Sequence, residues 1–196
     1  MSVHALDRAA GFAPAARLLA AWWSEPTAAE LDRWDGSWAA AEEVADRLGV
    51  GGVELLRETA SEADPALLRE EHERLLVGPG RTPCPPYESM WRSGQARRDQ
   101  GRLMAACAAD VARLYSGLGL RVRAAAHELP DHLVVELEAL AFALEHDATD
   151  IAATLAREHL AAWTPAFCDG VAAETTEPFY AALARVTPEW TAALSA

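Results

Sequence analysis

The amino-acid sequence predicts an all-α domain, a bundle of about eight to ten helices. Two observations carry this prediction: Pro, Gly and capping residues divide the chain into helical stretches, and no alternating apolar and polar run is long enough for a strand. The chain has 196 residues, of which 51% are hydrophobic and 24% charged. This composition provides enough apolar material for the core of one domain, so we expect residues 1–196 to form a single domain.

Residues that favour helix starts recur along the chain. A proline at the first helical position lacks an amide hydrogen that would be unpaired there, and Ser, Thr or Asp side chains accept hydrogen bonds from free amides. A long helix is also expected from about Gln95 to Gly117, and Gly49 should end the third helix. Helices are predicted to begin at or near Pro14, Thr27, Ser37, Asp64, Asp131, Thr149, Thr164, Thr176 and Thr187.

A long loop interrupts this pattern. The stretch Gly78–Glu88 (GPGRTPCPPYE) contains two Gly and four Pro and cannot form regular helix. The helix before it carries His72, Leu75 and Leu76 on its apolar face. Because long loops in compact domains are usually functional, this segment is a candidate binding region.

Charge and cysteine content exclude several classes of protein. The formal net charge of −13 argues against non-specific nucleic-acid binding, and it fits either a basic partner or simple solubility. Cys84, Cys107 and Cys168 have no zinc-like spacing and are odd in number, so neither structural zinc nor a disulfide scaffold is expected. The apolar stretch at 18–23 is too short for a signal sequence or a membrane span. We therefore expect a cytoplasmic protein without stable membrane insertion.

The stretch 127–132 (HELPDH) superficially resembles a zinc-protease motif. That motif needs two histidines four residues apart on one helix. Here His127 and His132 are five apart, roughly 140° out of line on a helix, and Pro130 interrupts the backbone hydrogen bonding. A remaining metal site would combine His132 and Glu136 with a distant histidine, His146 or His159, which leaves a small metal-dependent hydrolase as an alternative.

The same stretch can also present a helix N-terminus to a partner. The residue before Pro130 is biased away from helix, so Asp131 is expected to be the N-cap and His132 to lie in the first turn. This arrangement would turn Glu128 and one Asp131 oxygen towards solvent. The alternative is that Asp131 only caps the helix and His132 packs against the core.

Four stretches in register resemble the TorD/DmsD/NarJ family of maturation chaperones for molybdenum-containing oxidoreductases. They lie between about residues 70 and 167 and consist of HERLLVGPG at 72–80, PPYESMW at 85–91, ExxDHLxxELE at 128–138 and HLxxWxPxF at 159–167. The chain differs from the usual family pattern at His72, where an aromatic residue is common, and at Leu76, where Phe is frequent. These differences affect the shape of the groove and the identity of the client.

This resemblance implies a non-enzymatic cytoplasmic chaperone without a cofactor or a metal. Its partner would be the apo catalytic subunit of a molybdopterin-containing oxidoreductase. The chaperone would bind that subunit's twin-arginine leader, hold back export and assist cofactor insertion, although some family members serve subunits without a leader. A monomer is expected, with a domain-swapped dimer as the alternative.

A receptor for such a leader needs carboxylates for the two guanidinium groups and an apolar groove for the segment that follows them. Leu75 and Leu76 could instead belong to the core, His72 could be a buried core histidine, and Tyr87 and Trp91 could simply cover the core. The resemblance favours a binding role for Asp131 and His132. The candidate binding residues are His72, Leu75, Leu76, Tyr87, Glu88, Met90, Trp91, Glu128, Asp131 and His132.

Overall fold

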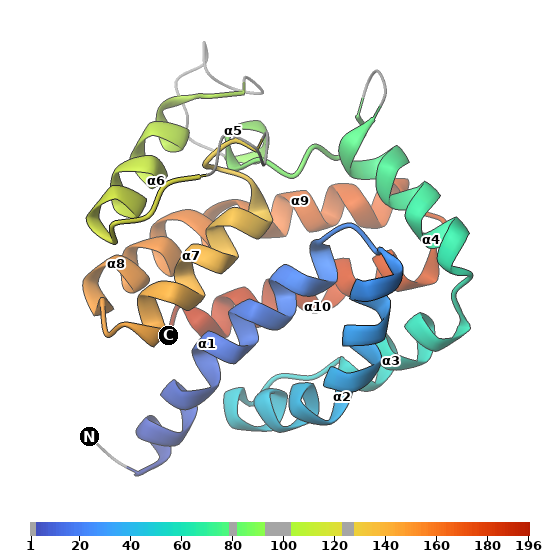
Figure 1. Ribbon diagram of the computed structural model, residues 1–196, viewed down its shortest axis with the longest axis horizontal. Helices are drawn as coiled ribbons and strands as arrows, with labels where there is room; N and C mark the ends of the chain where they lie inside the picture. The colour runs from blue at the N-terminus through green and yellow to red at the C-terminus, as the bar shows by residue number, and fades with distance from the viewer. Residues whose placement is uncertain (1–2, 79–81, 93–102, 123–127) are drawn as a thin grey trace.

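The fold is all-α, as the sequence predicts. The computed structural model describes residues 3–78, 82–92, 103–122 and 128–196, and side chains from residue 10 onward (Figure 1). In these residues the helices form nine continuous rods and there is no strand. Two of the rods change between α-helical and π-helical hydrogen bonding along their length.

The helices follow one another with short connections over much of the chain. In order they are α1 (Val3–Trp23), α2 (Ala28–Leu48), α3 (Val53–Glu62), α4 (Pro65–His72) continued by the π-helix η1 (Glu73–Val77), α5 (Glu88–Trp91), α6 (Ala106–Gly117), α7 (Leu133–Glu145), α8 (Thr149–Thr154) continued by the π-helix η3 (Leu155–Leu160) and by α9 (Ala161–Glu174), and α10 (Pro178–Leu194).

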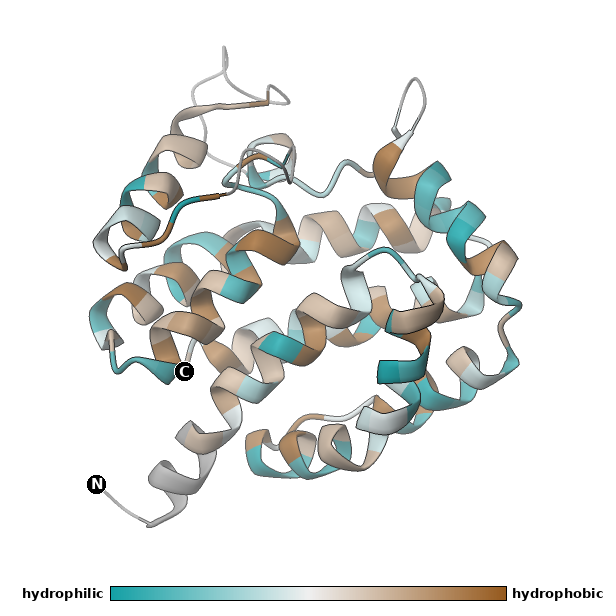
Figure 2. Cartoon of the chain, viewed as in Figure 1, coloured by the Kyte–Doolittle hydropathy of each residue, from teal (hydrophilic) through white to brown (hydrophobic). Residues whose placement is uncertain are grey.

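Two long helix pairs form the centre of the molecule. Helix α1 packs along α7 and against α2, while α9 packs along α10 (Figure 1). Aromatic side chains fill the space between them: Trp22 stacks on Trp38, and Trp23 contacts Phe167 with ring centroids 5.0 Å apart. Figure 2 shows many hydrophobic positions on α7 and α9 and a mixture of hydrophilic and hydrophobic positions on α4. None of the helices in the described residues combines the length and hydropathy needed to cross a membrane.

Several predicted helix ends are confirmed. Thr27 accepts a hydrogen bond from the Glu30 amide at the start of α2, and Gly49 ends that helix with a left-handed φ of 71°. Asp64 accepts a hydrogen bond from the Ala66 amide at the start of α4, with Pro65 in the first turn.

Other predicted helix starts are wrong because the helices continue through them. Pro14, Pro165 and Pro188 all lie inside helices. An interior proline costs about 3 kcal/mol, but burial of the residues around it can outweigh that cost. Ser37 also lies inside a helix, α2, where its hydroxyl donates to the Trp34 carbonyl oxygen.

The threonines before two of these prolines make tertiary contacts instead of capping. The buried hydroxyls of Thr164 and Thr191 lie 3.0 Å apart between α9 and α10. Thr187 accepts a hydrogen bond from Trp23 Nε1 at 2.9 Å, which ties α10 to α1. These contacts favour a continuous helix at both positions.

The segment before α6 also differs from the prediction. A helix was expected from about Gln95, which lies outside the described residues. Leu103 precedes α6, Met104 has a left-handed φ of 59°, and Ala105 is extended, so the helix begins only at Ala106. The loop prediction holds for the described residues 82–87, which are not helical.

Candidate functional site

Two distant stretches of the chain cross at the start of α7. The Glu88 amide donates to the Asp131 carbonyl oxygen and the Leu133 amide donates to the Pro86 carbonyl oxygen, both at 2.9 Å. These two bonds form an isolated antiparallel bridge between Tyr87 and His132. The Pro-rich segment and the end of HELPDH are thereby joined at one place.

The crossing places three polar side chains together. The Tyr87 and His132 rings meet edge to face with centroids 5.2 Å apart. The Tyr87 hydroxyl donates to Glu128 Oε2 at 3.1 Å, and His132 Nε2 lies 3.8 Å from the same oxygen. His132 Nδ1 accepts a hydrogen bond from the Val134 amide, so the proton of the neutral ring is assigned to Nε2, which faces Glu128.

Burial keeps the histidine and the tyrosine neutral near pH 7. It lowers the pKa of His132 to about 4, with a further contribution from the charge of His72. Burial also raises the pKa of Tyr87 to about 12, and the negative charge of Glu128 acts in the same direction. The pKa of Glu128 is itself raised by burial, against the opposing effect of the Tyr87 hydrogen bond. The three side chains thus offer hydrogen-bonding groups and a carboxylate, but no positive charge.

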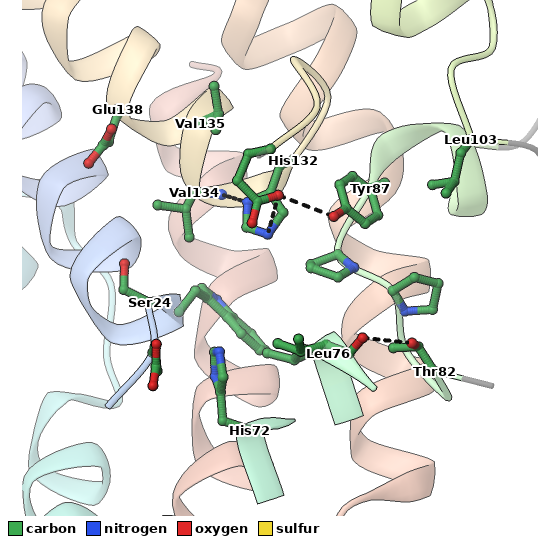
Figure 3. A pocket seen from close by; sticks show the side chains of 16 residues that line it. Ser24, His72, Leu76, Thr82, Tyr87, Leu103, His132, Val134, Val135 and Glu138 are labelled. Atoms are coloured by element: carbon green, nitrogen blue, oxygen red, sulfur yellow. Dashed lines mark hydrogen bonds and ion pairs between the residues drawn. The ribbon is translucent and has the colours of Figure 1, made fainter. Parts of the chain in front are cut away.

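These side chains line a groove of about 630 Å³ between the end of α1, the α4/η1 rod, the Pro-rich segment and the start of α7 (Figure 3). Apolar and aromatic side chains make up much of its wall, and no arginine is among the lining residues that the structure describes. The lining residues are Trp23, Ser24, Glu25, His72, Leu76, Val77, Thr82, Pro85, Pro86, Tyr87, Leu103, Glu128, His132, Val134, Val135 and Glu138.

Asp131 does not take the place that the sequence predicts. The N-cap of α7 is His132, whereas Asp131 is fully buried and its Oδ2 accepts a hydrogen bond from the Ser89 amide at 3.1 Å. The backbone crossing causes this shift, because it fixes residues 131 and 133 against the Pro-rich segment and turns the Asp131 side chain towards the first turn of α5. Asp131 therefore positions α5 from behind the groove and presents no oxygen to solvent.

A buried ionisable cluster lies next to Asp131. Glu88 is fully buried, receives a bond from Arg92 one turn later in the chain, and lies with its Oε2 2.9 Å from His159 Nδ1. Glu136 is also fully buried and accepts a hydrogen bond from Trp163 Nε1 at 3.2 Å. Burial raises the pKa of Glu136 well above its usual value, and the negative charge of Glu88 adds to this effect.

This arrangement gives His159 and Trp163 roles that sequence reasoning missed. Both belong to the HLxxWxPxF stretch, and both place ring nitrogens against carboxylates of the preceding stretches. The sequence did carry one signal for these roles: residues with ring nitrogens and acidic residues occur in the same set of motifs. Their pairing across the fold could not be read from the sequence.

A family model described as nitrate reductase delta subunit matches residues 38–169, which is more than half of the chain. The chain belongs to this family. It is thus a member of the NarJ/TorD type of redox enzyme maturation proteins, as the sequence motifs indicate. A search of curated proteins found no match.

A solved structure has a similar fold. It is the crystal structure of a candidate redox enzyme maturation protein from Archaeoglobus fulgidus, with a TM-score of 0.56 and 24% sequence identity. The similarity covers 88% of this chain and 89% of that chain. At this level of identity the likeness concerns the fold.

In this member of the nitrate reductase delta subunit family, the residues proposed from sequence fall into two sets. The first set lines the groove and consists of His72, Leu76, Tyr87, Glu128 and His132. The second set lies outside the groove lining and consists of Leu75, Glu88, Met90, Trp91 and Asp131. Their role in binding stays a prediction.

The second set supports the groove or the core. Leu75 is fully buried. Trp91 packs edge to face on Phe167 and donates from Nε1 to the Pro85 carbonyl oxygen at 2.7 Å. Sequence reasoning also missed much of the lining, including Trp23, Glu25 and Glu138. Trp23 and Glu25 lie outside the motifs, whereas Glu138 belongs to the motif at 128–138 but lies away from the helix start that was expected to bind.

The alternative metal site finds no geometric support. In the described residues, no three His, Cys, Asp or Glu side chains are placed to hold a metal ion together. His132 Nδ1 is bonded to the Val134 amide and Glu136 Oε2 to Trp163, so the two proposed ligands have different partners. His127, which belongs to the HELPDH motif, lies outside the described residues.

Proposed function

We propose that this protein is a cytoplasmic, non-enzymatic chaperone that binds the N-terminal region of an apo molybdenum-containing oxidoreductase catalytic subunit. The ligand is a twin-arginine leader or its remnant, and binding assists cofactor insertion, assembly and export proofreading. One observation carries the proposal: the groove at the backbone crossing is largely apolar and carries three glutamates, and none of its lining residues in the described part of the chain is an arginine.

The chemistry of the groove suits such a leader. A guanidinium group can form two parallel hydrogen bonds to a carboxylate, and Glu25, Glu128 and Glu138 supply carboxylates at the groove. The Tyr87 ring can also accept a cation over its face. The apolar segment after the arginines would pack on the wall that includes Leu76, as amphipathic helices do in apolar grooves.

Charge and family membership support the same partner. A net charge of −13 favours fast encounter with a basic peptide. The chain's family consists of redox enzyme maturation proteins, and a maturation protein must recognise a subunit before its assembly is complete. A roughly micromolar affinity, about 8 kcal/mol, would allow later release.

Fluorescence anisotropy with a labelled synthetic peptide tests the groove. The peptide carries two adjacent arginines followed by an apolar helix-forming stretch. Replacing Glu25, Glu128 and Glu138 together with Gln should weaken binding at least tenfold, or by about 1.4 kcal/mol or more, because the groove loses its three glutamate carboxylates. Replacing Glu54, Glu58 and Glu62 with Gln, on the exposed face of α3, makes the same charge change away from the groove and should leave the affinity unchanged.

Equal affinities for the two triple variants would refute the groove assignment, and failure of any such peptide to bind would refute the proposed ligand. Affinity capture from native cytoplasm, followed by mass spectrometry, tests the partner. Recovery of a molybdoenzyme catalytic subunit is expected.

A further inference from the structure

The two ends of the groove differ in chemistry. Glu138 on α7 and Ser24 at the end of α1 lie on one side of His132, whereas Leu103 and Tyr87 lie on the other (Figure 3). Glu25, which follows Ser24 in the chain, also lines the groove. The groove therefore has an acidic end, formed by Glu25 and Glu138, and an apolar end.

The acidic end is open to a cation. Glu25 and Glu138 are exposed, and neither forms an ion pair with another residue in the described part of the chain. The positive charge of Arg17 acts on Glu138, but the Arg17 guanidinium is held by two hydrogen bonds to Glu145, at 3.2 and 2.9 Å. Two carboxylates thus flank this end without a bound counter-charge from the described chain.

The apolar end exposes side chains that would normally be covered. Val77 and Leu103 line the groove and are 64% and 51% exposed. They are two of the four large hydrophobic residues that the described part of the chain exposes, and Met104, which follows Leu103 in the chain, is a third and is 70% exposed. Apolar side chains grouped at the mouth of a groove indicate contact with an apolar partner.

Glu128 lies between these ends and is already engaged. Its Oε2 accepts a hydrogen bond from the Tyr87 hydroxyl and faces His132 Nε2. A ligand at this central position competes with an existing hydrogen bond, whereas a ligand at Glu25 and Glu138 does not. The acidic end is therefore the better place for the strongest positive charge of a ligand.

From this polarity we infer the direction in which a peptide occupies the groove. The paired guanidinium groups bind at Glu25 and Glu138, and the apolar segment that follows runs past His132 towards Val77 and Leu103. The peptide enters at the α1–α7 end and leaves along the Pro-rich segment. This inference rests on the proposed function, because it takes a basic and then apolar leader as the occupant.

Site-specific photo-cross-linking tests the direction. Two versions of the synthetic peptide carry a benzophenone side chain, one directly before the arginine pair and one at the end of the apolar stretch. Mass spectrometry should find the first cross-linked near Ser24 and Glu138, and the second near Val77 and Leu103. The reverse pattern would overturn the inferred direction while leaving the proposed function intact.

Binding measurements with matched variants add a second test. The double variant Glu25→Gln and Glu138→Gln should bind the arginine peptide at least tenfold more weakly, but should bind a peptide with both arginines replaced by glutamine as the wild type does. The control is Glu54→Gln with Glu58→Gln, which removes two exposed charges from α3. Equal weakening by both double variants would mean that only net charge matters and would refute the site.

A third variant addresses the apolar end. Replacing Val77 and Leu103 with Ser should weaken the binding of both peptides, the one with two arginines and the one with glutamines in their place, by the same factor of about ten. Both peptides contain the apolar stretch. A weakening confined to the arginine peptide would contradict the assigned direction. If neither peptide binds the wild-type protein, the proposed function itself fails.

Discussion

Replacing His72 with Phe should remove a large part of the protein's loss of stability in mild acid. His72 is 7% exposed at the end of α4, with Nδ1 3.2 Å from the Tyr180 hydroxyl. Burial lowers its pKa from 6.5 to about 4. A phenylalanine fills a similar volume and has no proton to bind.

The sign and size of the effect follow from this pKa. Below 6.5 the unfolded chain binds a proton at His72 that the native state does not bind, so stability is lost as the pH falls from 6.5 towards 4. Between about pH 7.5 and about pH 5 this loss amounts to about 2 kcal/mol. The variant does not suffer this loss. It also lacks the His72 charge that helps to lower the pKa of His132, which further reduces the loss of stability in acid.

Urea denaturation at several pH values measures the difference. The stability of His72→Phe relative to the wild type should rise by about 2 kcal/mol from about pH 7.5 to about pH 5, or roughly 4–8 °C in melting temperature. The loss of the hydrogen bond to Tyr180 changes the free energy of unfolding by the same amount at every pH. The quantity to compare is therefore the slope of the free energy of unfolding against pH. His146→Phe, at an exposed position on the end of α7, is the control and should follow the wild-type slope. Parallel curves for His72→Phe and the wild type would refute the burial of an uncharged His72.

Three further substitutions test the supporting structure. Asp131→Ala should lower the free energy of unfolding by about 1–3 kcal/mol, measured by urea denaturation, because the buried Ser89 amide loses its acceptor; an unchanged value would contradict that contact. Because the pKa of Glu136 is raised in the folded state, the wild type loses stability as the pH rises above 4.5, and Glu136→Gln should remove this loss. The free energy of unfolding of the variant should therefore increase relative to that of the wild type from acid to neutral pH. A difference that stays constant with pH would argue against a protonated Glu136. Gly170→Ala should destabilise by about 1–3 kcal/mol despite better helix propensity, because its Cβ would lie 2.4 Å from the Trp91 ring; a higher melting temperature would show that Trp91 can move away.

The sequence predicted local features of the fold well where local chemistry decides them. Thr27, Gly49 and Asp64 end or begin helices as expected, because a cap satisfies backbone groups within a few residues of itself. The prediction that Thr164 and Thr187 start new helices failed, because their hydroxyls bond to neighbouring helices. A residue that suits both a cap and a tertiary contact cannot be assigned from sequence.

The candidate site was predictable in its location but not in its internal arrangement. The motifs brought Tyr87, Glu128 and His132 to attention, and these residues do lie together. The exchange of roles between Asp131 and His132 depends on two backbone hydrogen bonds to a segment more than forty residues away, at Glu88 and Pro86. Sequence spacing carries no information about such a crossing.

This exchange changes how a binding defect at Asp131 should be interpreted. Asp131 lies behind the groove and holds the Ser89 amide, so its loss would displace α5 and, with it, Tyr87. Asn can still accept from Ser89, whereas Ala cannot. Asp131→Asn should therefore bind the arginine peptide nearly as the wild type does, while Asp131→Ala should bind it more weakly. If both variants lost affinity equally while remaining folded, the negative charge of Asp131 would act on the ligand directly, and its role as a positioning residue would be wrong.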